Sequence, residues 1–147
     1  MFALVFLLFA GVSSTRADEV DDAVAKAILY LKGQVVTPDI TMALVAAGES
    51  VDVEYLKNFS GDSAISYAKP IMALAAAARD PRTFPNEDFV AKMKSFADGA
   101  QLGSADQIKD DIWWILALAS AGVPTADSVF QSSKAFLLNN HNNSYQH

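Results

Sequence analysis

The sequence predicts an all-α protein built from α/α helical hairpins, and three observations carry this prediction. Apolar residues recur every three or four positions along most of the chain, and no run alternates apolar with polar residues as a β-strand would. Glycine and proline interrupt the pattern at short intervals, as they do between short helices. Three apolar segments also end alike, which indicates a degenerate repeat: residues 43–48, 73–78 and 117–122.

The first predicted helix covers residues 20–31, and Gly33 ends it. Its apolar residues fall on one face at helical spacing: Val20, Ala23, Val24, Ala27, Ile28 and Leu31. A helix with one apolar face packs that face against an apolar neighbour. The segment therefore predicts an amphipathic helix at the surface of the domain.

A strongly apolar helix is predicted next. Thr37 caps its first turn, and Pro38 takes the first helical position, where its missing N–H costs nothing. Residues 40–47 are nearly all apolar, which is typical of a helix that is buried on all sides. A short amphipathic helix over residues 50–59 is predicted to follow.

Asp62 is predicted to cap a longer helix that runs to about Arg79. Tyr67, Lys69 and Pro70 mark an irregularity inside it, because proline removes one helical hydrogen bond. Such irregularities sometimes line binding sites, but we interpret this one as a break within the hairpin.

Three further helices are predicted, each opened by a side chain that caps its first turn. Their starts are Asn86, Ser104 and Thr125, and their ends are Gly99, Gly122 and Leu138. The polar residues 139–144 predict a frayed end. The connections are short, so we expect consecutive helices to pack antiparallel.

The repeats follow one another at about 30 to 45 residues, a period found in helical repeat proteins. One hairpin-repeat domain over residues 18–147 is therefore predicted, with a strongly apolar inner layer and an amphipathic outer layer. The predicted core contains Ala43, Leu44, Ala73, Leu74, Leu116, Ala117 and Ala119.

The N-terminal segment, residues 1–17, predicts a signal peptide. Residues 2–12 are uniformly small or apolar, too few to cross a bilayer, and Thr15-Arg16-Ala17 fits a cleavage site. No Lys or Arg precedes the apolar run, so a buried N-terminal helix is the alternative. The signal-peptide interpretation places the protein in a secreted or periplasmic location.

Composition excludes several kinds of site. The net charge is −6, from 11 basic and 17 acidic residues, so a nucleic acid backbone would be repelled. The chain has no cysteine, which excludes thiol nucleophiles and cysteine-ligated metals. His141 and His147 lie in a polar tail with no helical face to orient them. We therefore predict no cofactor, no metal, no transmembrane span and no nucleic acid partner.

Residues 110–122, with the sequence DDIWWILALASAG, resemble the inner helix of the repeats in the terpenoid cyclase and protein prenyltransferase superfamily. The resemblance extends over about residues 24–144. It implies an α/α toroid, of which this chain supplies about half, since a complete toroid has about six hairpins.

The resemblance carries the family's chemistry only in part. Asp110 and Asp111 match the last two carboxylates of the Asp-x-Asp-Asp motif in squalene-type cyclases, whereas Ile108 stands in the leading position. The zinc site of the prenyltransferases needs a cysteine, which is absent. Asp110 and Asp111 are thus weak catalytic candidates, and stabilisation of the helix dipole is the alternative.

Trp113 and Trp114 are the candidate ligand-binding residues, because indole rings stack on apolar groups and attract cations. Neighbours on a helix point about 100° apart, so both rings cannot face one pocket. The alternative is that one ring packs in the core while the other is partly exposed.

These observations favour a non-catalytic extracytoplasmic binding or scaffold module over an enzyme. The partner expected is a protein or an apolar small molecule. The alternative is a fragment or divergent member of a terpene-cyclising or prenyl-transferring enzyme. The last helix, with Phe130, Phe136 and Leu137, is expected to pack on the preceding hairpin or on a second copy of the chain.

We expect export to remove residues 1–17, so that the mature protein begins at Asp18. N-terminal sequencing and intact mass of the protein isolated from its native cells measure this directly. An intact N-terminus on protein from the cytoplasmic fraction would contradict the signal-peptide prediction.

Overall fold

A computed structural model of the chain describes residues 12–85, 87–97 and 108–143. These residues form helices and connecting turns and contain no strand, so the all-α prediction is confirmed. The chain divides into two compact units, Met1–Val35 and Val36–His147.

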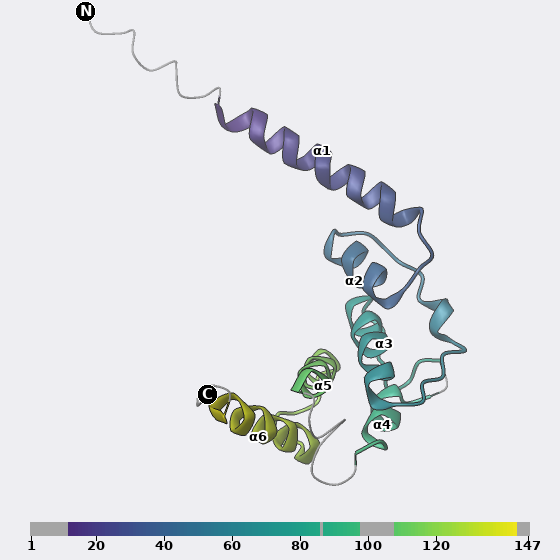
Figure 1. Ribbon diagram of the computed structural model, residues 1–147. Helices are drawn as coiled ribbons and strands as arrows, with labels where there is room; N and C mark the ends of the chain where they lie inside the picture. Colours follow the sequence, from purple (N-terminus) through teal and green to yellow (C-terminus); the bar gives the residue numbers. More distant parts are fainter. Residues whose placement is uncertain (1–11, 86, 98–107, 144–147) are drawn as a thin grey trace, which may run out of the picture. The chain divides into compact units, whose positions relative to one another are not determined.

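The first unit is built around one helix, α1 (Val12–Lys32), which Figure 1 shows as a single uninterrupted rod. It starts eight residues before Val20, where the apolar pattern begins, and runs through the expected cleavage position at Ala17. From Ala17 to Lys32, every side chain is at least partly exposed.

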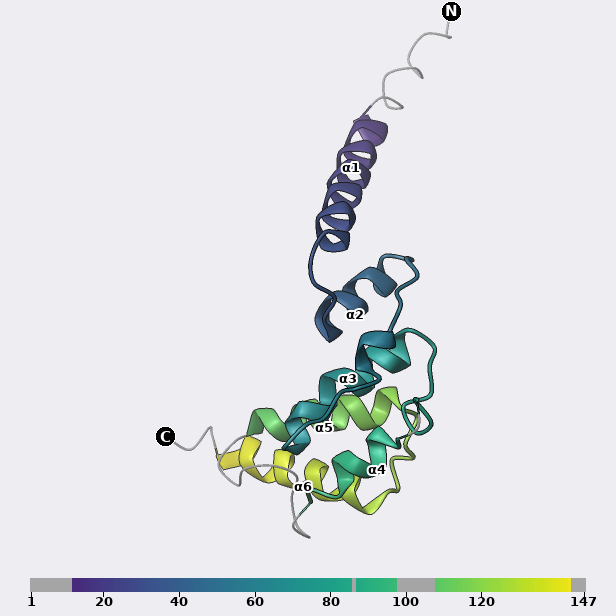
Figure 2. The same cartoon turned by 90° about the vertical axis from the view of Figure 1, so that its right-hand side faces the viewer.

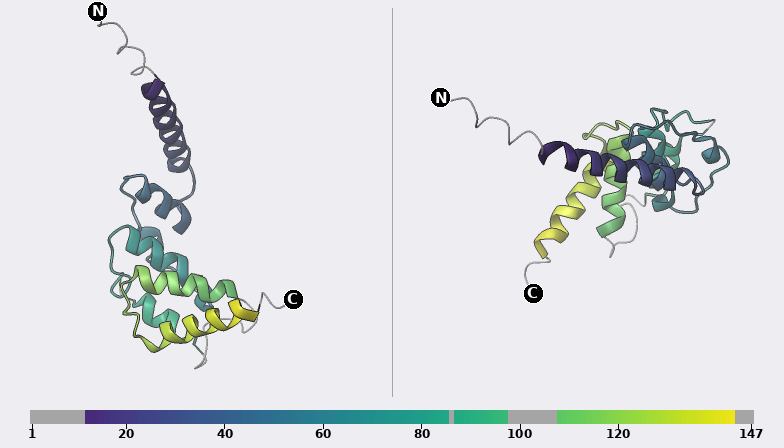
Figure 3. Two further views of the ribbon diagram at one scale, coloured as in Figure 1. Left: turned by 90° about the vertical axis from the view of Figure 1, so that its left-hand side faces the viewer. Right: turned by 90° about the horizontal axis from the view of Figure 1, so that it is seen from above.

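The second unit contains the other helices. They are α2 (Pro38–Ala46), the single 3₁₀ turn η1 (Glu54–Leu56), α3 (Ala64–Ala76), α4 (Phe89–Lys94), α5 (Ile108–Ser120) and α6 (Ser128–Asn143). α3 packs against α2, α4 and α5, and α5 also packs against α6 (Figure 2). Figure 3 shows α5 and α6 lying side by side. α3 thus occupies the centre of this unit.

The helices α2, α3 and α5 end in the same way, at the three similar segments of the sequence. In each, a leucine carbonyl accepts a hydrogen bond from the amide N–H five residues later. The pairs are Leu44 with Glu49 at 3.0 Å, Leu74 with Arg79 at 2.9 Å, and Leu118 with Val123 at 2.9 Å. The residue before each donor is left-handed: Gly48 at φ 83°, Ala78 at φ 55° and Gly122 at φ 66°.

The core is centred on α3. Its residues Ala68, Ile71, Ala73 and Leu74 have no exposed surface. Aromatic rings belong to the same core, and Tyr67 is in edge-to-face contact with Phe59 at a centroid distance of 5.2 Å. The core also takes in buried residues from the other elements: Leu56, Phe84, Phe89, Val90, Met93, Trp114, Ala117, Leu118 and Phe130.

The predicted core was right at four positions and wrong at three. Leu44, Ala73, Leu74 and Ala117 are buried, whereas Ala43, Leu116 and Ala119 are exposed. The error comes from the assumption that a helix without a polar face is covered on all sides. α5 is covered only where it meets its neighbours, and Leu116 is 45% exposed on the opposite side.

Two further predictions about local structure were wrong. Pro70 does not break its helix, because α3 runs through it, and the proline is itself buried. The helix expected over residues 50–59 is reduced to the single turn η1. This segment belongs to a long connection from α2 to α3.

The boundaries of the later helices also differ from the prediction. Asp88 caps α4 by accepting the N–H of Ala91 at 2.8 Å. Thr125 caps no helix, because α6 begins at Ser128 and the carboxylate of Asp127 accepts the N–H of Val129. α6 continues through the polar residues to Asn143 instead of fraying. The predicted cap Asn86, the stop Gly99 and the capping box of residues 104–107 lie outside the described residues.

α6 places part of its apolar face against the rest of the chain. Phe130 is buried in the core, and Phe136 and Leu137 are partly buried. The ammonium of Lys94 forms an ion pair with Asp127, which ties the end of α4 to the start of α6. The hydrogen bond from Lys94 holds the pKa of the Asp127 carboxyl below its ordinary value. Packing on the preceding hairpin is thus confirmed, and self-association through this helix stays a prediction.

The left-handed helix ends generate the first stability prediction. Ala78→Gly should raise the free energy of unfolding by about 0.5–1 kcal/mol, because alanine is strained at positive φ. Gly48→Ala and Gly122→Ala should lower it by about 1 kcal/mol each. At both glycines an added Cβ would meet no atom within 4 Å, so backbone strain alone is tested. Urea titration measures all three, and a destabilised Ala78→Gly would contradict the shared helix end.

Leu116 and Leu118 form a matched pair on α5. Leu118→Ala should lower the free energy of unfolding by about 2–5 kcal/mol, because its side chain is fully buried. Leu116→Ala should cost less than about 1 kcal/mol, since the side chain is already half exposed. Equal losses in a denaturant titration would show that both faces of α5 are covered.

Candidate functional site

Three side chains from three helices meet on one exposed face of the second unit. The Nζ of Lys69 on α3 lies 2.8 Å from Oδ2 of Asp39 on α2. The same Nζ lies 5.4 Å from the ring centroid of Trp113 on α5. We call this set the Asp39–Lys69–Trp113 row. The row joins α2, α3 and α5, the three helices that share the left-handed C-terminal turn.

The two contacts within the row contribute little to the stability of the fold. The side chains of Lys69 and Asp39 are 43% and 59% exposed, and an ion pair at that exposure contributes about 0–1 kcal/mol. A cation over an exposed indole adds about 0.5–1 kcal/mol. Asp39 lies in the first turn of α2, where the helix dipole favours a carboxylate. The row therefore leaves polar groups at a surface that a partner can reach.

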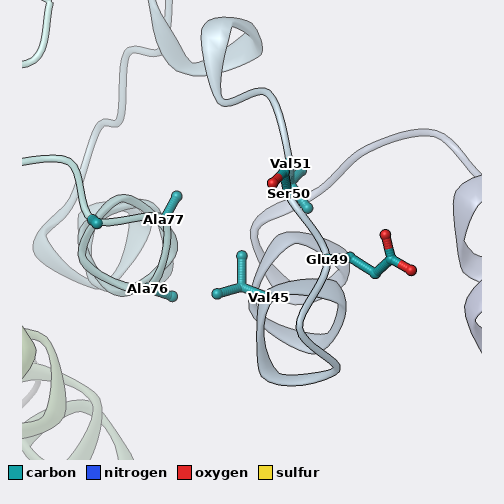
Figure 4. A pocket seen from close by; sticks show the side chains of 7 residues that line it. Val45, Glu49, Ser50, Val51, Ala76 and Ala77 are labelled. Carbon is teal, nitrogen blue, oxygen red and sulfur yellow. The ribbon is translucent and has the colours of Figure 1, made fainter.

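Two contacts between α2 and α3 show how the two helices are directed relative to each other. Asp39, at the start of α2, contacts Lys69 in the middle of α3. Figure 4 shows Val45, near the end of α2, pointing toward Ala76 at the end of α3. The two helices thus run parallel, so the antiparallel prediction was wrong for this pair. The connection that contains η1 is long enough to return the chain to the same side.

A hollow lies where α2 and α3 end and has a volume of about 250 Å³. Its lining is Val45, Glu49, Ser50, Val51, Ala76, Ala77 and Ala78. The carboxylate of Glu49 points away from Val45 and Ala76 (Figure 4). The hollow is smaller than the roughly 300–1,000 Å³ that encloses a drug-sized ligand. Of its lining side chains only Glu49 and Ser50 are polar, and the Glu49 carboxylate points away, so the hollow does not bring an acid, a base and a nucleophile together.

A second exposed feature runs along α5. Ile108, Ile112 and Leu116 are 37%, 45% and 45% exposed. Their spacing of four places them in one row along the helix, which we call the α5 stripe. Lys109 is exposed one residue after Ile108, and Trp113 borders the stripe on the side of α3. The stripe and the Asp39–Lys69–Trp113 row thus share an edge.

The two tryptophans lie in different surroundings. Trp114 has no exposed surface, whereas Trp113 is partly exposed beneath Lys69. A ligand would reach Trp113 at the surface but would have to displace core side chains to reach Trp114. Lys69, which the sequence placed at a break within the hairpin, is the group that joins Trp113 to Asp39.

The two candidate carboxylates also differ. Asp110 is partly exposed and Asp111 is fully buried, and both lie in the first turn of α5. That position is where a helix dipole stabilises negative charge. The burial of Asp111 was not foreseen, because a charged residue beside a tryptophan pair gives no periodic signal of the side it faces.

Other buried polar atoms were also missed from sequence. The hydroxyl of the fully buried Thr41 lies 2.9 Å from the hydroxyl of Tyr55, and partial burial raises the pKa of Tyr55. Within the described ranges, Trp114 Nε1 and Ser133 Oγ are buried without a hydrogen-bond partner. A buried polar atom that stays unpaired costs about 1–3 kcal/mol.

The described residues contain neither a candidate metal site nor a candidate membrane span. No three His, Asp or Glu side chains in those ranges cluster closely enough to hold a metal ion. None of the helices in the same ranges is both long and apolar enough to span a membrane. The side chain of His141, and His147 as a whole, lie outside the description.

Comparisons with known proteins give no relative. No protein-family model matches the chain, and neither a curated protein nor a solved structure is significantly similar to it.

The different exposure of the two tryptophans generates a spectroscopic prediction. Acrylamide should quench the fluorescence of Trp113 and leave that of Trp114 nearly unchanged. Trp113→Phe should therefore remove most of the quenchable emission, while Trp114→Phe should retain it. Circular dichroism of both variants controls for folding. Equal quenching of the two single-tryptophan proteins would contradict the burial of Trp114.

Proposed function

We propose that the chain is a non-catalytic, extracytoplasmic binding module that docks an acidic amphipathic helix of a partner protein. The α5 stripe is the observation that carries this proposal. Ile108, Ile112 and Leu116 expose aliphatic surface that the core does not use. The repeat type expected for the module is that of the prenyltransferases and squalene cyclases.

The geometry of the stripe favours a helix as the occupant. Ile108 and Leu116 are eight residues apart, a rise of about 12 Å or just over two helical turns. An amphipathic helix presents apolar side chains at three- and four-residue spacing, which matches such a row. Trp113 supplies an aromatic edge, and aromatic rings are common anchors at protein interfaces.

Charge at this face favours an acidic partner. The chain as a whole carries a net charge of −6. Lys109 and Lys69 nevertheless lie on or beside the stripe, and Asp39 offsets only one of them. A partner with a carboxylate beside its apolar row gains attraction at the rim of the contact and orientation on approach.

The arrangement of the acids supports binding over catalysis. Protonation of a polyene needs an enclosed, dry site and a second carboxyl that tunes the acid. Position 108, where the cyclase motif has that carboxyl, holds an isoleucine on the exposed stripe. The hollow between α2 and α3 is lined by Glu49, Ser50 and five apolar residues, and it lies at the C-terminal ends of the two helices.

Site-specific photo-cross-linking in the native cells tests the proposal. A photoreactive amino acid is placed at Ile112, at Leu116 and, as a matched control, at the exposed Ala91 on α4. Residues 112 and 116 should link to the same segment of one protein, and position 91 should not. That segment should carry apolar residues at helical spacing with acidic neighbours, and Lys109→Glu should reduce its yield.

Two results would overturn the proposal. The first is identical cross-links from position 91, or a linked segment that is basic or lacks helical spacing. The second is turnover of squalene or of prenyl diphosphates by the purified chain that Asp110→Asn or Asp111→Asn abolishes. That second result would favour the enzyme alternative.

A further inference from the structure

The connection between α2 and α3 carries an N-glycosylation triplet. Asn58, Phe59 and Ser60 fit the pattern Asn-x-Ser, in which any residue except proline can stand in the middle. Transferases of the secretory path attach an oligosaccharide to the asparagine of such a triplet. This triplet closely follows η1 and lies outside any helix. Its backbone is therefore not held in a helical hydrogen-bond ladder.

The side chains of the triplet alternate between solvent and core. Asn58 and Ser60 are exposed, whereas the side chain of Phe59 is partly buried. The centroid of the Phe59 ring lies 5.2 Å from that of Tyr67 and 6.0 Å from that of Phe89. These aromatic contacts hold the middle residue against the core. The amide before it and the hydroxyl after it are therefore both accessible from solvent.

A glycan on Asn58 is compatible with this fold. An N-linked glycan is bulky and hydrophilic, so a folded domain tolerates it on an asparagine at the surface and not on a buried one. Asn58 is exposed, and the neighbouring ring that packs in the core belongs to Phe59. The chain can thus fold with the glycan in place and keep the contacts of Phe59 with Tyr67 and Phe89.

A second triplet, residues 142–144, lies in different surroundings. Asn142 belongs to α6, and Ser144 lies outside the described residues. The pattern requires both the asparagine and the hydroxyl two residues later, so the two groups have to reach one catalytic site together. Residues two apart on a helix do not face each other. The helical setting of Asn142 therefore favours Asn58 as the acceptor.

We propose that Asn58 is the acceptor of an N-linked oligosaccharide. This inference rests on the extracytoplasmic location in the proposed function, because the transferase acts on an exported chain. The donor is an oligosaccharyl diphosphate lipid. The amide nitrogen of Asn58 forms a bond to the anomeric carbon of the sugar, and the bond from that carbon to the diphosphate oxygen breaks. The lipid diphosphate leaves with the electron pair, and the amide loses one proton to a base of the transferase.

Mass spectrometry of the protein from its native cells tests the site. Enzymatic removal of the glycan in heavy-oxygen water converts a glycosylated asparagine into a labelled aspartate. Trypsin then releases residues 58–79, because it cleaves after Lys57 and Arg79 but not between Lys69 and Pro70. Asn58 is the only asparagine in this peptide. We expect the label at position 58 in protein from the extracytoplasmic fraction, and no label when the deglycosylating enzyme is omitted.

The cell fraction separates this inference from the proposed function. Extracytoplasmic protein with an unlabelled Asn58 would overturn the glycosylation site and leave the binding module standing. Protein found only in the cytoplasmic fraction, with Asn58 unmodified, would contradict both.

Variants expressed in the same cells connect the modification to the triplet. Asn58→Gln and Ser60→Ala should each abolish the mobility shift that glycosidase treatment produces, whereas Ser60→Thr should retain it. Both side chains are exposed, so circular dichroism should show the same helical fold in all variants. Asn142→Gln is the matched control and should leave the shift unchanged. A shift that survives Asn58→Gln would overturn the proposal.

Discussion

The close packing of α3 against its neighbours is the constraint on which the second unit depends. α3 packs against α2, α4 and α5, and α5 also packs against α6. Such approach requires small side chains, and Ala68, Ala73 and Ala117 are fully buried for this reason. Larger residues at these positions would force the helices apart, because protein interiors are already close-packed. The proposed binding face on α2, α3 and α5 depends on this packing, because it brings the three helices together.

Local signals in the sequence were sufficient for the all-helical class and for the shared end of three helices. Thr37 and Pro38 mark the start of α2 as expected, and the three similar segments end in the same left-handed turn. Such features depend on residues within one or two turns. Pro70 shows the limit of local reasoning, since tertiary packing keeps α3 helical across a residue that disfavours it.

Contacts between distant residues were not predictable in the same way. Lys69 pairs with Asp39 across 30 residues, and no spacing rule connects the two. Leu116 was assigned to the core because an apolar side chain looks the same whether it faces the interior or a partner. The different surroundings of Trp113 and Trp114 were predictable, because neighbouring residues on a helix point about 100° apart.

We expect α3 to be the most stable element of the second unit, and native-state hydrogen exchange tests this most directly. The amides of residues 71–76 should exchange only through global unfolding, with a protection free energy equal to that from urea titration. The helices at the edge, α2 and α6, should open at lower free energy. Exchange in α3 at a lower free energy than in α6 would contradict the central position of α3 and, with it, the shared face on which the proposed function rests.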